Sequence, residues 1–441
     1  MKIICIGTLD KFSRFYLKIK ENLKTDNKNH LFHIYSIHFS GFMYTLLRFK
    51  FSSWLPAKGW FNALINKKKY LRIIENKNQY KNINYKNFIT FHLKLNPSLS
   101  KISLLIQALS YIDILDDILK KKRPDAIILL GDSRLSIEIC IALAKVYNIK
   151  VYFIEQGPFN TTFFDPQGVN ANASINNINL KNASLPTKEQ IELVDYLINK
   201  PKQKKYKRSP IYRGIDYSLA YFFEKSYLFP PDLKYTDTFP KFYKFKQQVV
   251  SPLSIKPKGE IKLYLLILQV PLDVNMIYHS PNFKNHFEIV KAIHKNLPKN
   301  SKLILREHPI YKDKYDKELY DYVIKHNLSF DNHISLKDSL KQADVIVVNN
   351  STVGIEAISL KKTVVVLANA YYRHPEICIK YTKNDNLNSI LTKALNFKPK
   401  EQFIYHFLYN FLTQHLIEGF ITDENLNAPK SIAKKINKSY T

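Results

Sequence analysis

The sequence predicts an α/β protein with two Rossmann-like domains, and three observations lead to that prediction. A chain of 441 residues with 45% hydrophobic content is long and apolar enough to fill two cores. Short apolar runs alternate with helical patterns in two separate blocks, residues 125–155 and 262–368. The runs of the second block are apolar almost throughout, which is typical of parallel strands covered on both faces.

The first block reads as a βαβ unit. "DAIILL" (125–130) and "KVYFIE" (150–155) are predicted strands, and residues 134–148 between them carry apolar side chains at helical spacing. The N-terminal "MKIICIGTLDKF" is predicted to be the first strand, because its apolar run of five is too short for a signal peptide. The basic segment 198–214 is interpreted as a solvated insertion.

The second block contains four predicted strands with helices between them. The strands are 262–270, 302–307, 344–349 and 363–368. The Pro-rich stretch 249–262 is the expected interdomain link, and the chain after Pro399 is expected to be helical. The predicted domains are therefore 1–250, 260–395 and a C-terminal helical segment, 400–441. Two doubly wound domains with a closing helix form the GT-B type of glycosyltransferase architecture, with ligands at the carboxyl ends of the strands.

Charge and cysteine content narrow the function classes. The formal net charge of +30 favours partners that carry phosphate, but no nucleic-acid recognition motif accompanies it, so no nucleic-acid binding is expected. The three cysteines are far apart in apolar contexts, which predicts buried thiols in a reducing compartment. No apolar stretch approaches the ~20 residues that span a bilayer. The sequence thus predicts a cytoplasmic protein, at most peripheral to a membrane.

Residues 30–72 interleave aromatic and leucine side chains with basic ones. That composition fits an interfacial membrane segment, and equally a core strand followed by a packed helix. The sequence leaves both interpretations open.

Polar clusters follow the predicted strands, where open α/β sheets bind ligands. Asn350, Ser351 and Thr352 stand at a predicted helix start, which suits a phosphate group. The alternative for this cluster is a simple helix cap. The same alternative holds for the polar turn that begins at Gly131, and His308 has a purely structural role as its alternative. The candidates at the ends of predicted strands or just after them are Gly131, Asp132, Arg134, Gln269, Arg306, His308, Pro309 and Lys312.

Absent motifs also inform the choice of ligand. The chain has no GxxxxGK[ST] loop, no GxGxxG after a strand and no Asp-x-Asp pair. We therefore expect no metal and no dinucleotide cofactor, and a donor with a single phosphate held by hydroxyls, backbone dipoles and basic side chains.

Five segments in order resemble the capsule-polysaccharide β-Kdo transferases. "GDSRLSIEICIALAKVYNIKVYFIEQGPFNTTFFDPQGVNANAS" carries the G-D-x-R, E-x-G and G-V-N elements of that family. In the second block, "LQVPLDVNMIYHSPNF", "REHPIYK", "NNSTVGIEAI" and "VVVLANAYYRHP" look like its nucleotide-binding half. The resemblance covers residues 125–175 and 262–378. Gln156, Pro158, Phe159 and Asp165 depart from the usual pattern.

The resemblance implies a retaining transfer of Kdo from CMP-Kdo to a lyso-phosphatidylglycerol lipid or a Kdo-linker acceptor, at the inner membrane and within a capsule assembly complex. Retention generally needs one carboxylate as nucleophile and a second group as acid/base. Asp165 is predicted to be the nucleophile or cation stabiliser, and Glu155 the acid/base or its orienter. Simple turn and cap roles are the alternative.

The remaining site roles implied by the resemblance concern the donor and a substrate loop. His308, Ser351 and Thr352 would hold the CMP phosphate, and Arg306 and Lys312 would pair with the phosphate or the sugar carboxylate. The rest of the predicted donor-binding set is Gln269, Pro309 and Asn350, and the predicted substrate loop comprises Gly131, Asp132, Arg134, Gly157 and Asn170.

Two other functions stay open. A glycerol- or ribitol-phosphate polymer transferase uses a similar His-Pro and Ser-rich helix start, but it attacks phosphorus and has no use for a pair of catalytic carboxylates. A non-catalytic capsule export partner is the second alternative, and five ordered motifs argue against it.

Overall fold

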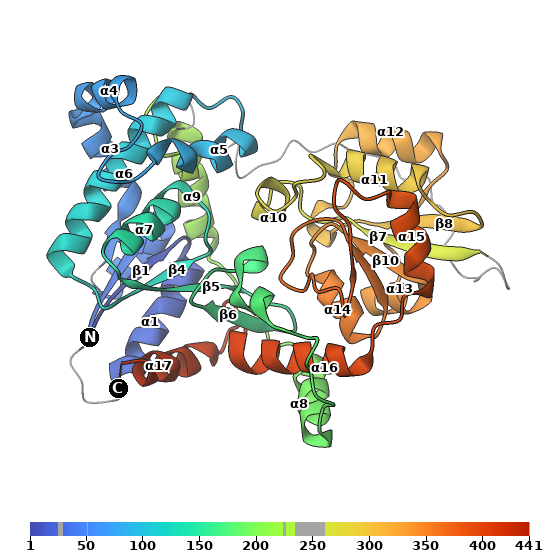
Figure 1. The fold of residues 1–441 in the computed structure, drawn as a ribbon. Helices are drawn as coiled ribbons and strands as arrows, with labels where there is room; N and C mark the ends of the chain where they lie inside the picture. Colours follow the sequence, from blue (N-terminus) through green and yellow to red (C-terminus); the bar gives the residue numbers. More distant parts are fainter. Residues whose placement is uncertain (25–29, 51, 224–225, 234–260, 441) are drawn as a thin grey trace. The chain divides into compact units, whose positions relative to one another are not determined.

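The computed structural model describes residues 1–24, 30–50, 52–223, 226–233 and 261–440, and it contains two compact α/β units (Figure 1). Each unit is built around its own mainly parallel sheet. The predicted fold class, two Rossmann-like domains, is therefore confirmed. Unit 1 comprises Met1–Val169, Lys200–Phe239 and Gln414–Thr441, and unit 2 comprises Asn170–Asn199 and Pro240–Thr413.

The sheet of unit 1 has seven strands in the order β13-β6-β5-β4-β1-β2-β3. From β3 to β5 the strands are parallel in the order 3-2-1-4-5, the doubly wound pattern, whose switch point lies between β1 and β4. β6 and β13 extend this sheet as antiparallel neighbours. The strands are β1 Lys2–Gly7, β2 Leu31–Ser36, β3 Ser52–Trp54, β4 Ala126–Leu130, β5 Lys150–Gln156, β6 Thr161–Asp165 and β13 Leu416–Glu418.

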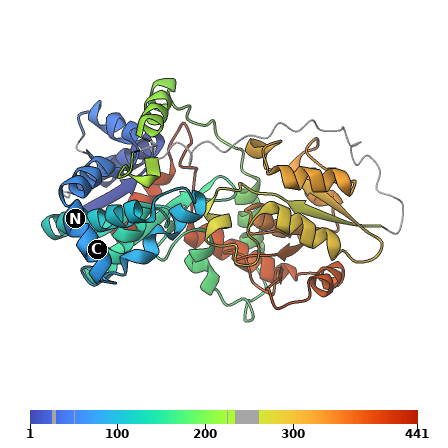
Figure 2. The ribbon, with the colours of Figure 1, turned by 90° about the horizontal axis from the view of Figure 1, so that it is seen from above.

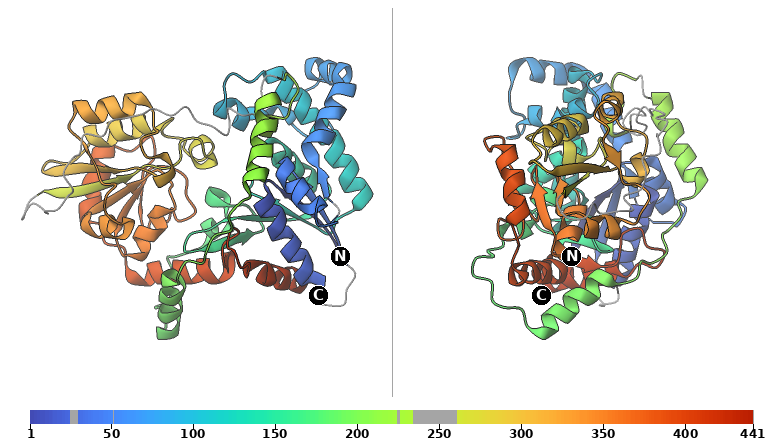
Figure 3. Two further views of the ribbon diagram at one scale, coloured as in Figure 1. Left: turned by 180° about the vertical axis from the view of Figure 1, so that it is seen from behind. Right: turned by 90° about the vertical axis from the view of Figure 1, so that its right-hand side faces the viewer.

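Helices α1 and α17 cover one face of this sheet. Phe15 and Ile19 of α1, with Ile432 and Ile436 of α17, pack on the inward side chains of β1, β2 and β4. Helix α6 is buried along most of its length, and α9 lies at the periphery of the unit (Figures 2 and 3). The helices are α1 Asp10–Lys24, α2 Phe39–Leu46, α3 Leu55–Ile65, α4 Lys67–Asn76, α5 Thr90–Leu95, α6 Lys101–Lys122, α7 Leu135–Val146, α9 Pro210–Phe223 and α17 Ala428–Lys438, with 3-10 turns η1 Tyr85–Ile89 and η4 Pro231–Leu233.

The sheet of unit 2 has six parallel strands in the order β12-β11-β10-β7-β8-β9. Counted within the unit this order is 6-5-4-1-2-3, so the switch point lies between β7 and β10. The strands are β7 Lys262–Ile267, β8 Ser301–Arg306, β9 Ser329–Phe330, β10 Val345–Val348, β11 Thr363–Val366 and β12 Ile379–Lys380.

Helices cover both faces of the second sheet (Figure 1). α11, α12 and α15 share one core with the side chains of β7, β8 and β10 that point to their side. The Asn285 side chain caps α11 by accepting the Glu288 N–H. The helices are α8 Lys188–Asn199, α10 Val274–Ile277, α11 His286–Lys295, α12 Lys317–Lys325, α13 Leu336–Gln342, α14 Val353–Ser359, α15 Leu387–Asn396 and α16 Glu401–Asn410, with 3-10 turns η2 Asn170–Asn172, η3 Ser174–Asn177 and η6 Pro309–Tyr311.

Residues 157–174 are rich in Gly, Pro and Asn and are therefore expected to form a loop, but the structure has a β-hairpin there. Thr161–Asp165 forms β6, which pairs antiparallel with β5 through a short turn. Phe159 and Asn160 adopt left-handed φ angles of 53° and 56° in that turn. Two threonines and two phenylalanines in succession have strong β propensity, so the hairpin forms where a Gly- and Asn-rich loop was predicted, and Asp165 ends a strand.

The division into units differs from the predicted domain limits in two places. Residues 170–199 belong to unit 2, where α8 contacts α16 and Gln402 Nε2 donates to the Ala183 carbonyl at 3.4 Å. The C-terminal segment is not helical throughout, because β13 joins the sheet of unit 1 beside β6. The expected link, 249–262, lies outside the described residues except for its last two.

The basic segment 198–214 is not a free insertion. Lys205 Nζ contacts Asp423 Oδ1 at 2.8 Å, and the Arg208 guanidinium bridges Asp10 and Asp216 at 2.5 and 2.7 Å. Asp10 is fully buried. Arg208 thus joins α1 to α9, because buried carboxylates require a charged partner.

Two further expectations concern cysteines and membrane spans. Cys5, Cys140 and Cys378 are buried and form no disulfide, as predicted, and burial raises the pKa of each thiol. Among the described residues, no helix has both the length and the apolar content needed to cross a bilayer.

Candidate functional site

The turn after β4 and the end of β5 bring two predicted residues together in unit 1. Leu130 pairs with Ile154, so Gly131 lies beside Glu155 at the carboxyl edge of the sheet. Gly131 has a φ of +71°, and a Cβ there would lie 3.6 Å from Glu155 Oε2. Glu155 is partly exposed, and its Oε1 accepts the Gln156 N–H at 2.8 Å. A partly exposed carboxylate therefore lies at the edge where open α/β sheets bind ligands.

Lys11 is a neighbour of Glu155 that sequence reasoning missed. It stands at the start of α1, after β1 and thus on the other side of the switch point. Burial lowers the pKa of Lys11, and the negative charge of Glu155 acts in the opposite direction. A nearby cation favours the ionised form of a carboxylate. The acidic and basic pair in "GTLDK", directly after the first strand, was the available signal.

Asp165 has a different environment from Glu155. Its side chain is fully buried. Oδ1 accepts the N–H groups of Gln167 and Gly168 at 2.8 and 3.3 Å, and Oδ2 lies 3.3 Å from His415 Nδ1. These contacts reverse the chain at the end of β6, which is the Asx-turn behaviour of an aspartate. The structure therefore gives Asp165 a turn-forming role beside the catalytic one predicted for it.

The chain after Asp165 returns to the turn after β4. Val169 N–H donates to Asp132 Oδ2 at 3.3 Å. Asn170 follows with a φ of +52° and begins unit 2. Gly157 lies in the β5–β6 turn, where a Cβ would overlap Thr161 Oγ1 at 2.5 Å. Of the predicted substrate loop, Gly131 and Asp132 therefore meet at one edge, while Gly157 is required by the hairpin itself.

Arg134 is anchored by a buried aspartate that the sequence did not single out. Its Nη1 lies 3.3 Å from Asp232 Oδ1, and His92 Nε2 lies 3.1 Å from the same oxygen. The side chains of Asp232 and His92 are fully buried, whereas Arg134 is one-third exposed. Arg134 also has an unusual φ of +102°. Such a conformation persists only when surrounding contacts stabilise it, and the contact with Asp232 is one that does so.

In unit 2, the predicted donor residues Gln269 and Asn350 lie across the switch point. Gln269 follows β7 and Asn350 follows β10. Gln269 Nε2 donates to Asn350 Oδ1 at 2.8 Å, and Asn350 N–H donates back to Gln269 Oε1 at 3.3 Å. Asn350 Nδ2 also donates to carbonyls of Asn275, His279 and Asn369. Both side chains are buried, so they hold the loops of the switch point in place.

His308 follows β8 at the same edge, next to the switch point. Its Nδ1 accepts the Ile310 N–H at 3.3 Å, so the neutral ring carries its proton on Nε2. Burial lowers the pKa of His308, while Asp273 acts in the opposite direction. A neutral imidazole with a protonated Nε2 is a hydrogen-bond donor at neutral pH. This donor suits a phosphate oxygen.

Tyr315 positions the His308 loop, although sequence reasoning gave it no role. Its hydroxyl accepts the His308 N–H at 3.2 Å and donates to the Gln269 carbonyl at 3.1 Å. Tyr315 is buried. The loops after β7 and β8 are therefore tied to each other through one hydroxyl group.

Arg306 has internal hydrogen-bond partners. Arg306 Nη1 donates to the Asp331 carbonyl at 2.7 Å and to Ser339 Oγ at 2.6 Å, and Nη2 donates to a third acceptor, the Ile334 carbonyl. These bonds use the guanidinium to hold the chain between β9 and α13. The phosphate role predicted for Arg306 would compete with them.

Asp273 is a second residue in this region that the sequence reasoning passed over. It follows β7, and burial raises its pKa. Its charge acts on His308 and on Tyr311. The acid in "VPLDVN" stands after a predicted strand, which was the signal for it.

Ser351 and Thr352 lie between β10 and α14. Thr352 is exposed, and Ser351 Oγ accepts the Val353 N–H at 3.3 Å, which leaves its hydroxyl proton for a ligand. The predicted donor residues Pro309 and Lys312 are exposed in the turn after His308. The structure thus brings His308, Ser351 and Thr352 to the carboxyl edge of one sheet.

Gly354 allows a buried tyrosine to hold Ser351. The Tyr372 hydroxyl donates to the Ser351 carbonyl, and the Tyr372 ring occupies the space that a Cβ on Gly354 would need. Gly354→Ala is therefore expected to destabilise unit 2 by about 1–3 kcal/mol, the usual cost of overpacking. Urea unfolding followed by far-UV circular dichroism measures the change.

The matched control is Gly214→Ala in α9, where an added Cβ meets nothing within 4 Å. It is expected to leave stability unchanged or to raise it by about 0.5–1 kcal/mol, because alanine favours helix more than glycine does. Equal losses in the two variants would contradict the role given to Tyr372.

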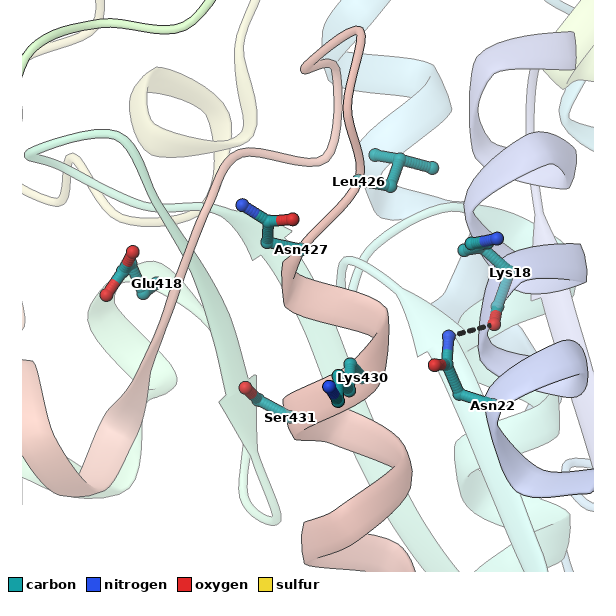
Figure 4. A pocket seen from close by; sticks show the side chains of 7 residues that line it. All are labelled: Lys18, Asn22, Glu418, Leu426, Asn427, Lys430 and Ser431. Carbon is teal, nitrogen blue, oxygen red and sulfur yellow. Dashed lines mark hydrogen bonds between the residues drawn. The ribbon is translucent and has the colours of Figure 1, made fainter. Parts of the chain in front are cut away.

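A surface cavity of about 360 Å³ lies elsewhere in unit 1 (Figure 4). None of the predicted site residues lines it. Its walls come from α1, β13 and α17, and its lining residues are Lys18, Asn22, Glu418, Leu426, Asn427, Lys430 and Ser431. Among the residues that the structure describes, no group of three His, Cys, Asp or Glu side chains is placed to hold a metal ion.

Part of the second half of the chain matches a known protein family. Residues 241–419 match the family "Capsule polysaccharide biosynthesis protein". Protein FixF of Sinorhizobium fredii (strain NBRC 101917 / NGR234) is 27% identical over 172 residues, which cover 38% of this chain and 40% of FixF. The capsule polysaccharide export protein KpsS of Escherichia coli is 26% identical over 141 residues, covering 30% and 36%. The chain thus matches less than half the length of these curated relatives.

Solved structures also resemble the chain at low identity. The β-Kdo 2,7 transferase KpsC of Thermosulfurimonas dismutans is 15% identical, covers 74% of this chain and 89% of its own, and has a TM-score of 0.37. The UDP-GlcNAc 2-epimerase of Methanocaldococcus jannaschii is 14% identical with coverage of 99% and 100% and a TM-score of 0.34. The segment that matches the family contains the whole sheet of unit 2 with Gln269, His308 and Ser351. Residues 241–419, which hold this sheet, are therefore similar to the capsule polysaccharide biosynthesis protein family.

Proposed function

We propose that the chain is a retaining glycosyltransferase that moves Kdo from CMP-Kdo to a lipid or Kdo-linker acceptor in capsular polysaccharide biosynthesis. One observation carries the proposal. The family-matched segment sets Gln269, His308 and Ser351 after β7, β8 and β10, three adjacent strands at the switch point of one doubly wound sheet. Open α/β sheets bind nucleotides at such switch points.

The chemistry of this edge fits a nucleotide with one phosphate. His308 Nε2 and the Ser351 and Thr352 hydroxyls are hydrogen-bond donors, and the exposed Lys312 adds a positive charge. A monophosphate diester carries one negative charge, which a few donors and one cation neutralise without a metal. Gln269, Asn350 and Tyr315 hold the loops that present these groups.

The carboxylates of unit 1 are proposed to act on the sugar. Glu155 is partly exposed, lies beside Gly131 and has the cation Lys11 as an electrostatic neighbour. A nucleophilic carboxylate must be ionised, and Lys11 favours that form. We therefore assign the nucleophile role to Glu155. Asp165 holds the turn that follows β6, and the Val169 N–H after that turn donates to Asp132. This proposal moves the nucleophile role from Asp165, for which the sequence predicts it, to Glu155.

In this scheme Glu155 attacks the anomeric carbon as CMP leaves with the bonding electron pair. The oxygen of the acceptor hydroxyl then displaces the Glu155 carboxylate and releases its proton to water, so two inversions give retention. The proposed partners are the sugar nucleotide, a phospholipid or lipid-linked acceptor, an anionic membrane surface and a capsule assembly complex. The proposed location is the cytoplasmic face of the inner membrane.

Replacement of His308 tests the donor site. His308→Ala is expected to weaken CMP binding by about 1–3 kcal/mol, the loss of one hydrogen bond to a charged group. Isothermal titration calorimetry with CMP measures it. His326→Ala is the control, since His326 lies at the end of α12 and is exposed. Unchanged CMP affinity in both His308→Ala and Ser351→Ala would remove the donor site from this edge.

A further inference from the structure

One region of unit 1 leaves large hydrophobic side chains in solvent. Half of the exposed large hydrophobic side chains in the described part of the chain lie on α2, α3, α9 and the residues that follow them. Phe49 is 96% exposed, Ile65 81% and Phe222 76%. We call this region the α2–α3–α9 face, and its exposed apolar residues are Leu46, Leu47, Phe49, Phe61, Leu64, Ile65, Ile211, Tyr217, Tyr221, Phe222 and Tyr227.

Ring contacts join these helices into one surface. Trp60 of α3 lies 6.2 Å from Phe223 of α9, between ring centroids, and Tyr44 of α2 lies 6.1 Å from Tyr212 of α9. Lys67 Nζ, at the start of α4, lies 5.3 Å from the Tyr227 ring. Helix α9 stands at the edge of unit 1 in two views (Figures 2 and 3). The exposed side chains therefore sit on connected elements rather than at scattered points.

Helix α9 carries large apolar side chains on the side that faces solvent. Its inner side contributes Ala220 to the fold and Asp216, which pairs with Arg208. Its outer side presents Ile211, Tyr221 and Phe222 to solvent. A soluble helix normally turns polar residues outward, so this face requires a partner.

The charges around the face decide which partner fits. No Asp or Glu occurs between residues 27 and 74, a segment that contains α2 and α3. Exposed cations lie among the apolar side chains of that segment, and the only acid of α9 is paired internally. These cations are Arg48, Lys50, Lys58, Lys67 and Lys68, together with Lys69, which also pairs with Asp113 at 2.9 Å. Aromatic and aliphatic side chains interspersed with cations match the boundary between acyl chains and anionic headgroups.

We propose that the α2–α3–α9 face docks unit 1 on an anionic phospholipid bilayer. Phe49, Ile65 and Phe222 enter the interface, and the lysines of α3 and α4 contact the headgroup phosphates. If the proposed function is correct, this docking explains how the chain reaches a lipid acceptor. The docking itself needs neither donor nor acceptor, so it can be tested separately. It also combines the two interpretations left open for residues 30–72: β2 belongs to the core, and the helices after it pack on the fold with one side and would carry the membrane surface on the other.

Vesicle co-sedimentation of the full chain tests the proposal. Vesicles of phosphatidylcholine alone are compared with vesicles that contain one-quarter phosphatidylglycerol, at low and high NaCl, with no sugar nucleotide present. We expect binding to the anionic vesicles and release at high salt, because screening weakens headgroup attraction. Equal binding to the two vesicle types would overturn the anionic surface as the partner.

Two variants locate the contact. The triple variant Phe49→Ser, Ile65→Ser, Phe222→Ser is expected to lower the partition coefficient at least roughly tenfold. Lys67→Gln with Lys68→Gln is expected to lower it roughly fivefold per lysine. Wild-type partitioning in both would overturn the proposal. Circular dichroism verifies that each variant is folded.

Matched controls carry the same chemical changes elsewhere. Val146→Ser, Leu185→Ser and Ile324→Ser remove exposed apolar side chains, and Lys299→Gln with Lys302→Gln removes two exposed lysines. These variants should partition as the wild type does, and a loss equal to that of the face variants would overturn the assignment to this face.

Light scattering tests whether a second copy of the chain, rather than a membrane, covers the α2–α3–α9 face. If the wild type self-associates and the triple variant abolishes that association without changing vesicle binding, the face joins two copies of the chain and the proposal is wrong. A chain that binds vesicles and transfers no sugar would refute the proposed function while leaving the docking surface intact.

Discussion

Glu155→Gln is expected to lower sugar transfer by roughly 10⁴-fold or more, the scale of effect seen when an enzyme loses its nucleophile. Glutamine retains the shape and the partial exposure of Glu155 beside Gly131, but it cannot form a glycosyl ester. CMP binding should be unchanged, since the lost interaction belongs to the transition state. Transfer rates under saturating donor, together with CMP calorimetry, measure the two effects.

Asp165→Asn is the matched comparison. An asparagine oxygen can still accept the N–H groups of Gln167 and Gly168 that shape the turn. We expect transfer to stay within roughly tenfold of wild type, because a carboxylate that only holds a turn is replaceable by an amide. The opposite pattern, an inactive but folded Asp165→Asn with an active Glu155→Gln, would return the nucleophile role to Asp165.

Asp232→Ala is expected to destabilise unit 1 by about 3–5 kcal/mol. Removing one partner of a buried ion pair leaves the other desolvated and unpaired. Here the anchored Arg134 loses its acceptor, and the buried His92 loses the carboxylate that lies 3.1 Å from its Nε2. Both tryptophans, Trp54 and Trp60, lie in unit 1, so their fluorescence during urea unfolding reports on this unit.

The control for Asp232 is Asp117→Ala in α6. Asp117 pairs with Lys121, and both side chains are more than half exposed. Such a pair contributes about 0–1 kcal/mol. A loss from Asp232→Ala no larger than that of the control would contradict the anchoring role.

The same aspartate predicts a pH dependence of stability. Burial alone raises the pKa of Asp232, but His92 and Arg134 outweigh that effect and hold it at about 2. Because the folded pKa lies below the ordinary value, the stabilisation is complete above about pH 4 and is lost as the pH falls towards 2. It amounts to about 2 kcal/mol. In Asp232→Asn this part of the acid sensitivity should vanish.

How much the sequence predicts depends on the range of the interactions involved. The apolar strands β1, β4 and β5 of the first sheet and β7, β8, β10 and β11 of the second were predictable, because alternating apolar runs and helical patterns are local signals. Gln269, His308 and Ser351 were predictable as a group, because residues that follow parallel strands gather at one sheet edge. Once the order of the strands is known, it alone places these three residues at the switch point.

The parts that could not be predicted depend on contacts distant in sequence. Asp232 meets His92 and Arg134 from more than ninety residues away. β13 joins the sheet beside β6 from the end of the chain. Asp165 looked like a loop residue because Gly, Pro and Asn surround it, but the strand partners on both sides of β6 outweigh that local composition.

The most direct test of the proposed function is the mass of the product. The full chain is incubated with CMP-Kdo and synthetic lyso-phosphatidylglycerol, and in a parallel reaction with a Kdo-terminated lipid acceptor. The account predicts that one of these acceptors gains the mass of Kdo, that wild type and Asp165→Asn produce it, and that Glu155→Gln does not. A chain that leaves both acceptors unchanged with CMP-Kdo, and instead adds glycerol phosphate or ribitol phosphate from the corresponding cytidine nucleotide, would contradict it.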